Sequence, residues 1–132
     1  MKVAVCIDKE GGMMFFGRRQ SMDRILREKM FSLTQGKIFV NEFTADQFEN
    51  KDGLHISESF LQEAGEEDLC FVENVPFDIN KVNTLYIFNW NRLYPSDVTF
   101  NYALDGFKKI KTEKFEGNSH PKITLETYIR KG

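Results

Sequence analysis

A short apolar run near the N-terminus constrains the fold more than any other feature of this sequence. Residues 3–7 are all apolar and rich in β-branched side chains, and turn-forming residues from Asp8 to Gly12 follow them. An unbroken run of this length is typical of a strand whose two faces are both buried. We therefore expect residues 3–7 to form a strand at the centre of a sheet.

The segment after residue 20 carries apolar residues at helical spacing, at positions Met22, Ile25, Leu26, Met30 and Leu33. This interval of three or four residues predicts an amphipathic helix. We expect Ser21 to cap its N-terminus, with Asp23 in the first turn, and Gly36 to end it.

Two shorter helices are expected in the middle of the chain. Thr44 and Gln47 have the spacing of a capping box, and Phe43 and Phe48 bracket them as a hydrophobic staple. Ser57 is expected to cap another helix, which ends at Gly65.

Further apolar segments predict strands at residues 38–40, 69–72 and 85–90, with a brief one at 55–56. Residues 106–115 and 122–130 read as a long hairpin, since polar and apolar residues alternate cleanly in its second arm. This order of elements predicts an α/β fold with a mixed central sheet, flanking helices and a C-terminal antiparallel hairpin. With 132 residues, we expect a single domain over residues 1–132.

Charge and hydropathy exclude several classes of function. Eighteen Lys and Arg against 20 Asp and Glu give a net charge of −2, so we expect no nucleic-acid partner. No apolar run approaches the roughly 18 residues of a membrane span, so we expect no membrane association and a cytoplasmic location. Cys6 and Cys70 lie in predicted core strands and are expected to be buried thiols.

Motifs along the chain follow one another in the order of a known family. They are the loop, helix and Gly-Lys of residues 8–37, Leu85-Tyr86-Ile87, Pro95 to Phe100, the turn at residues 114–121 and Thr127-Tyr128. Together they resemble the dihydrofolate reductase family, which implies that family's fold. The run from Gly12 to Arg24 also resembles a group of small, uncharacterised bacterial proteins.

The positions that carry the family's chemistry are replaced here. The resemblance implies a buried carboxylate on the first helix that binds the pterin, and Leu26 stands at that position. Glu73 and Asn74 replace the glycines that approach the cofactor pyrophosphate, so we expect no bound cofactor. A shift of one residue would place Asp23 or Glu28 nearer the pocket, so an NADPH-dependent reductase of a small heterocycle remains the alternative.

A basic cluster lies at the start of the first expected helix. Arg18, Arg19 and Arg24 flank Ser21, and free N–H groups at a helix start also favour an anion. We expect these four residues to bind an anionic small molecule or protein partner. Alternatively, Arg18 and Arg19 are solvated and Arg24 pairs with Glu28 one turn later.

An apolar string precedes this cluster, made up of Met13, Met14, Phe15 and Phe16. As a strand it would point two side chains inward and two outward, and the outward pair would form a partner-binding surface. Alternatively, the string is a loop that fills the core. The exposed hairpin edge and the 13 phenylalanines make a homodimer plausible.

No constellation for catalysis or metal binding is evident. His55 and His120 lack neighbours at ligand spacing, and His120 is expected simply to sit in the hairpin turn. The sequence thus predicts a non-catalytic binding or interaction protein on a degenerate dihydrofolate reductase-like scaffold, with no metal site.

Overall fold

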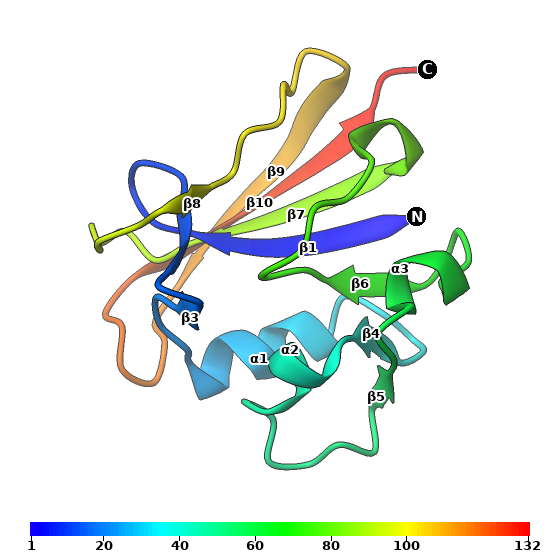
Figure 1. The fold of residues 1–132 in the computed structure, drawn as a ribbon. Coiled ribbons are helices and arrows are strands. Elements are labelled where there is room, and N and C mark those ends of the chain that lie inside the picture. Colours follow the sequence, from blue (N-terminus) through cyan, green and yellow to red (C-terminus); the bar gives the residue numbers. More distant parts are fainter.

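The computed structural model describes residues 1–132, and its core is a seven-stranded mixed sheet (Figure 1). The strand order is β5-β4-β6-β1-β7-β10-β9. Their bounds are β1 Lys2–Ile7, β4 Ile38–Val40, β5 Leu54–Ile56, β6 Leu69–Phe71, β7 Thr84–Asn89, β9 Phe107–Phe115 and β10 Ile123–Arg130. The strands from β5 to β7 are parallel, whereas β10 and β9 are antiparallel. The predicted fold class is confirmed.

The central position predicted for residues 3–7 is confirmed by β1. Val3, Ala4 and Val5 have no exposed surface. Ala4 belongs to the apolar cluster on one face of the sheet, and Val3 and Val5 belong to the cluster on the other face. Each face of β1 is therefore packed, which is why the run shows no polar alternation.

The sheet divides at the carboxyl end of β1. This strand pairs with β7 along its whole length, from Lys2 to Ile7, but with β6 only as far as Ala4. The loops that follow β1 and β6 therefore diverge, at the edge where ligands bind in open α/β sheets.

A small second sheet covers this end of the molecule, in the order β3-β2-β8 (Figure 1). Its strands are β2 Gly12–Phe15, β3 Arg18–Arg19 and β8 Val98–Thr99. The turn between β2 and β3 places Phe16 and Gly17 at positive φ, 51° and 70°. A phenylalanine rarely adopts this conformation, so the hairpin tip is strained at Phe16.

Helix α1, Arg24–Phe31, packs Leu26 and Met30 against the sheet, as its periodicity predicts. The cap predicted at Ser21 is wrong. Asp23 is the N-cap, because its carboxylate accepts hydrogen bonds from the backbone N–H groups of Ile25 and Leu26. The helix also ends at Phe31, well before Gly36.

The capping box predicted at Thr44 and Gln47 is also wrong. Helix α2, Glu42–Ala45, starts earlier, because the side chain of Asn41 accepts the bond from the Thr44 N–H. Helix α3, Phe60–Glu63, is capped by Ser59 without a side-chain bond, so Ser57 is not its cap either. A 3₁₀ turn, η1 Ile79–Lys81, leads into β7.

The predicted C-terminal hairpin is confirmed as β9 and β10, and β9 forms one edge of the sheet. This edge carries the exposed lysines Lys108, Lys109, Lys111 and Lys114. Such charges discourage pairing with another strand. None of the helices has the length and apolar character needed to cross a membrane.

Candidate functional site

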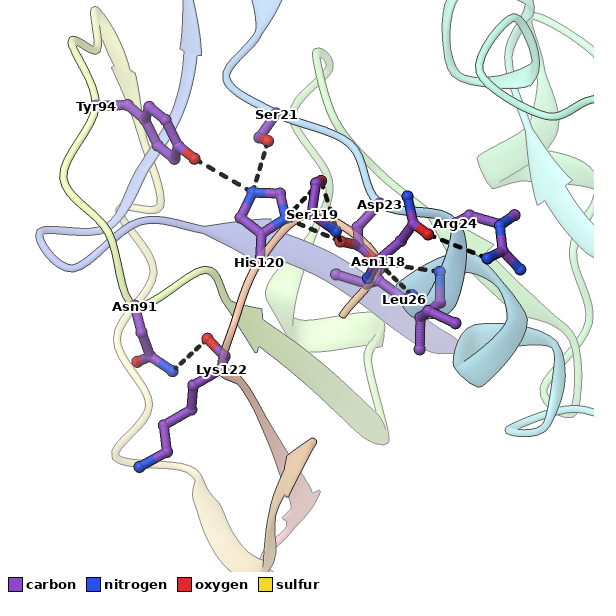
Figure 2. A network of polar contacts seen from close by, with 11 residues as sticks. Ser21, Asp23, Arg24, Leu26, Asn91, Tyr94, Asn118, Ser119, His120 and Lys122 are labelled. Atoms are coloured by element: carbon purple, nitrogen blue, oxygen red, sulfur yellow. Dashed lines mark hydrogen bonds and ion pairs between the residues drawn. The ribbon is translucent and has the colours of Figure 1, made fainter. Parts of the chain in front are cut away.

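A buried network joins the start of α1 to the turn between β9 and β10 (Figure 2). His120, in the turn, lies 2.9 Å from Asp23 through Nδ1 and 2.8 Å from the Ser21 hydroxyl through Nε2. The Asp23 side chain has no exposed surface, and His120 is 4% exposed. The carboxylate of Asp23, the imidazole of His120 and the hydroxyl of Ser21 thus form a continuous chain of hydrogen bonds.

Asp23 is the anchor of this network. Besides capping α1, its carboxylate accepts the backbone N–H groups of Asn118 and Ser119, each at 2.9 Å. Burial alone would raise the pKa of Asp23, but the bonds from Asn118, His120, Ser119 and Leu26 outweigh it and hold that pKa far below its ordinary value. Asp23 is therefore ionised at neutral pH.

The ionised carboxylate orients the His120 ring. It accepts a hydrogen bond from the Nδ1–H group, so in the neutral imidazole Nε2 is left as an acceptor. Two hydroxyls reach this nitrogen, Ser21 at 2.8 Å and Tyr94 at 3.2 Å. The indole of Trp90 lies 4.5 Å from the imidazole between ring centroids, so the ring is also held by packing.

A second buried carboxylate, Asp8, ties the neighbouring loops together. It accepts hydrogen bonds from the backbone of Glu10, Gly12 and Tyr94 and from the Gln20 side chain. Burial opposes ionisation of Asp8, but these bonds prevail and lower its pKa. The loop after β1 is thereby fixed to the segments that carry Ser21 and Tyr94.

Arg19 and Glu73 form a largely buried ion pair where the sheet divides. Arg19 Nε lies 3.1 Å from Glu73 Oε2, and Arg19 Nη2 donates to the carbonyl of Phe43 at 2.7 Å. Gln47 also donates to Glu73. Burial raises the pKa of Glu73 more than these partners lower it, so desolvation is the dominant influence on this carboxylate.

The structure does not bring the predicted anion-binding residues together. Arg19 is occupied by Glu73, and Arg24 pairs with Glu28 at 2.9 Å, as the alternative interpretation expects. Ser21 faces His120, and Arg18 is exposed. Anion binding at these residues stays a prediction, and Arg18 is the one of the three arginines that forms no ion pair.

The apolar string lies in β2 and in the turn after it, with alternating burial as expected for a strand. Met14 is buried, and Met13 and Phe15 are half-buried. Met13 lines a pocket of about 360 Å³, together with Glu73 and Tyr102. Phe16 is 77% exposed.

Exposed apolar side chains gather on two segments at this end of the molecule. Of six large apolar residues with exposed side chains, four are Phe16, Met22, Leu93 and Val98. Their segments, 16–22 and 93–98, are joined by hydrogen bonds from Gln20 Nε2 to the Pro95 carbonyl and from the Phe16 N–H to Asp97. We call these four residues with Arg18 the end surface.

The space between α1 and the sheet is filled by side chains. Leu26 is 1% exposed and belongs to the same apolar cluster as Phe48 and Phe71. Phe48 packs edge-on against both Phe31 and Phe71. Asp23 and Glu28, the two carboxylates considered as substitutes at the position of Leu26, do not point into this space. Asp23 bonds to the hairpin turn, and Glu28 lies on the surface with Arg24.

Comparison with solved structures identifies the fold. The architecture is that of dihydrofolate reductases, and the expectation drawn from the sequence motifs is confirmed. One such structure is the dihydrofolate reductase from Enterococcus faecalis in complex with NADP(H) and RAB-propyl. The match has a TM-score of 0.67 and 14% identity, and it covers 99% of this chain and 96% of that chain. No family model matches the sequence, and no curated protein does.

The residues at the carboxyl end of β6 do not fit a dinucleotide. A buried carboxylate, Glu73, stands where the resemblance places the pyrophosphate, and it already occupies the guanidinium of Arg19. A phosphate beside Glu73 would meet a like charge in a poorly solvated site. No group of three or more His, Cys, Asp or Glu side chains is placed to hold a metal ion.

Sequence reasoning missed the contact between His120 and Asp23. The two residues are 97 positions apart, so no local spacing reveals the pair. The available signal was limited to the position of Asp23 three residues before Leu26, which is ordinary N-cap spacing.

Proposed function

We propose that this chain is a binding protein without reductase activity, and that it uses its dihydrofolate reductase-like scaffold to hold a protein partner on the end surface. The observation that carries the proposal is the concentration of exposed apolar side chains at Phe16, Met22, Leu93 and Val98. Exposed apolar residues on neighbouring segments are candidates for an interaction surface. The hairpin tip supports this, because Phe16 adopts a positive φ there and its side chain is 77% exposed.

The charges around the end surface favour a partner with acidic residues. Arg18 is next to the hairpin tip, and Arg92 precedes Leu93; both are exposed, and neither forms an ion pair within the chain. Exposed arginines beside apolar side chains are typical of interface residues that bind carboxylates. The expected partner segment therefore combines apolar anchors with Asp or Glu.

The packing beneath α1 favours binding over the reductase alternative. A reductase of a heterocycle needs an open pocket with a proton donor, and Leu26 and Phe48 occupy this region. The ion pair of Arg19 with Glu73 likewise disfavours a dinucleotide.

Site-specific photo-crosslinking tests the proposal. A photoreactive phenylalanine analogue is placed at Phe16, and at Ile110 as the control, because Ile110 is a large apolar residue exposed on the edge strand β9. Crosslinking is carried out in cells of the source organism, and the adducts are sequenced. We expect one defined protein adduct from position 16 that is absent from position 110 and weakened by Arg18→Glu.

Two results would contradict the proposal. One is the same set of adducts from both positions, which would indicate random collision. The other is a specific adduct that is insensitive to Arg18→Glu and to replacement of Leu93 by Ser, because the end surface would then not be the binding surface.

A further inference from the structure

We propose that Ser21 is an activated nucleophile, with His120 as its general base, and that the chain can cleave carboxylic esters through an acyl-Ser21 intermediate. This activity goes beyond the binding function proposed above and does not depend on it. The inference rests on the juxtaposition of Ser21, His120 and Asp23 at the junction of α1 with the hairpin turn (Figure 2).

The three side chains have the contacts that nucleophile activation requires. Ser21 Oγ is 2.8 Å from His120 Nε2, and His120 Nδ1 is 2.9 Å from Asp23 Oδ2. A serine is a weak nucleophile until a base accepts its proton, and the base must in turn be oriented by a third group. Asp23 is the positioning residue here, fixed by the backbone N–H groups of Asn118 and Ser119.

Burial distinguishes the roles of the three residues. Asp23 and His120 are enclosed, so the carboxylate and imidazole interact in a poorly solvated setting. Ser21 is half-buried, so it is the least enclosed of the three residues. We expect a reagent to enter the network at Ser21 while the proton-accepting pair stays protected.

Backbone donors are available beside the hydroxyl. The N–H groups of Ser21 and Met22 have no hydrogen-bond acceptor within the chain. Ester cleavage places a negative charge on the carbonyl oxygen, and free N–H groups close to the nucleophile are the groups that stabilise it in acyl transfer.

The reaction balances with an ester and water. The Ser21 oxygen bonds to the carbonyl carbon while its proton passes to His120 Nε2, and the bond to the alcohol oxygen then breaks as that oxygen takes the proton. Water attacks the acyl-serine with His120 again accepting a proton. The acid leaves, and the proton returns to Ser21 Oγ.

Tyr94 also reaches His120 Nε2, at 3.2 Å. Its hydroxyl competes with Ser21 for the same lone pair. Replacing Tyr94 by Phe removes the competitor, so the reactivity of Ser21 should be retained or increased.

Labelling with a fluorophosphonate, followed by peptide mass spectrometry, tests the inference. The serine oxygen bonds to phosphorus, fluoride leaves, and the proton goes to His120. We expect modification of Ser21 at a rate at least about a hundredfold above that of the exposed Ser59, since general-base catalysis typically contributes 10²–10⁴-fold. Ser21→Ala should abolish the labelling, whereas Ser59→Ala should leave it unchanged.

Two variants separate activation from folding. His120→Gln and Asp23→Asn are compared with wild type at a temperature where circular dichroism reports each as folded. We expect labelling at Ser21 to fall about a hundredfold or more in the first and about tenfold or more in the second. If a variant does not fold, the wild-type ratio of Ser21 to Ser59 decides the question. Equal labelling of these two serines in the wild type, or an undiminished rate in folded His120→Gln, would overturn the inference.

Discussion

Replacing Asp23 by Ala should destabilise the fold strongly, because this buried carboxylate joins the start of α1 to the hairpin turn. The change removes the cap of α1, which costs about 1 kcal/mol, and leaves the buried His120 without its partner. A buried donor left without its acceptor typically costs about 1–3 kcal/mol. These contributions overlap, and water can reach the freed N–H groups of the turn, so we expect a total of about 3 kcal/mol.

Urea unfolding followed by circular dichroism measures this difference at pH 7. Asp46→Ala is the matched control, because Asp46 is exposed and its side chain makes no hydrogen bond. The control should change the free energy of unfolding by no more than about 0.5 kcal/mol. A loss below about 1 kcal/mol in Asp23→Ala, with the urea dependence unchanged, would refute the view that this carboxylate holds the helix to the hairpin.

Two further predictions follow from buried charges. The pKa of Asp23 in the folded chain is below the unfolded value of 3.8, so its contribution to stability is present above that pH and is lost as the pH falls. Unfolding free energies measured between about pH 5 and pH 2 should therefore decline less steeply in Asp23→Asn than in the wild type; equal slopes would contradict this. Arg19→Met should cost about 3–5 kcal/mol in urea unfolding at pH 7, because it leaves Glu73 buried without a counter-ion, and adding Glu73→Leu should recover most of that loss. A double variant as unstable as the single one would show that the cost is lost packing.

Strands were predictable where local sequence decides the structure. Residues 3–7 carry enough apolar, β-branched surface to require burial on both faces, and β1 has that burial. The hairpin of β9 and β10 followed from alternation along residues 123–130. In both cases the pattern reports directly on which side chains meet the core.

Helix starts were less predictable, because several residues compete for each cap. Ser21 and Asp23 both suit an N-cap, and the choice of Asp23 depends on the hairpin turn that supplies its other donors. Asn41, and not Thr44, caps α2, and the Asn41 side chain also donates a hydrogen bond to Asn74, which lies in a distant loop. Tertiary contacts of this kind leave no trace in local spacing.

The candidate site was predicted in part. The sequence predicted that two side chains of residues 13–16 point outward without saying which, and in the structure Phe16 is exposed, as is Arg18. It grouped Arg19 with Arg18, although adjacent residues of a strand point to opposite sides, and Arg19 turns toward Glu73. Ser21 was predicted to bind an anion because its actual neighbour, His120, lies 99 positions away in the sequence and could not be seen from local spacing.

Side chains close the space between α1 and the sheet, and we infer that the residues after β6 are unsuited to a dinucleotide. Thermal unfolding in the presence of NADPH, NADP⁺ and dihydrofolate, singly and in pairs, tests both points. A ligand at a hundred times its dissociation constant stabilises the folded state by about 2.7 kcal/mol. We expect an unchanged midpoint of thermal unfolding with every combination at millimolar concentration. A saturable rise in the midpoint with NADPH, strengthened by dihydrofolate, would contradict it.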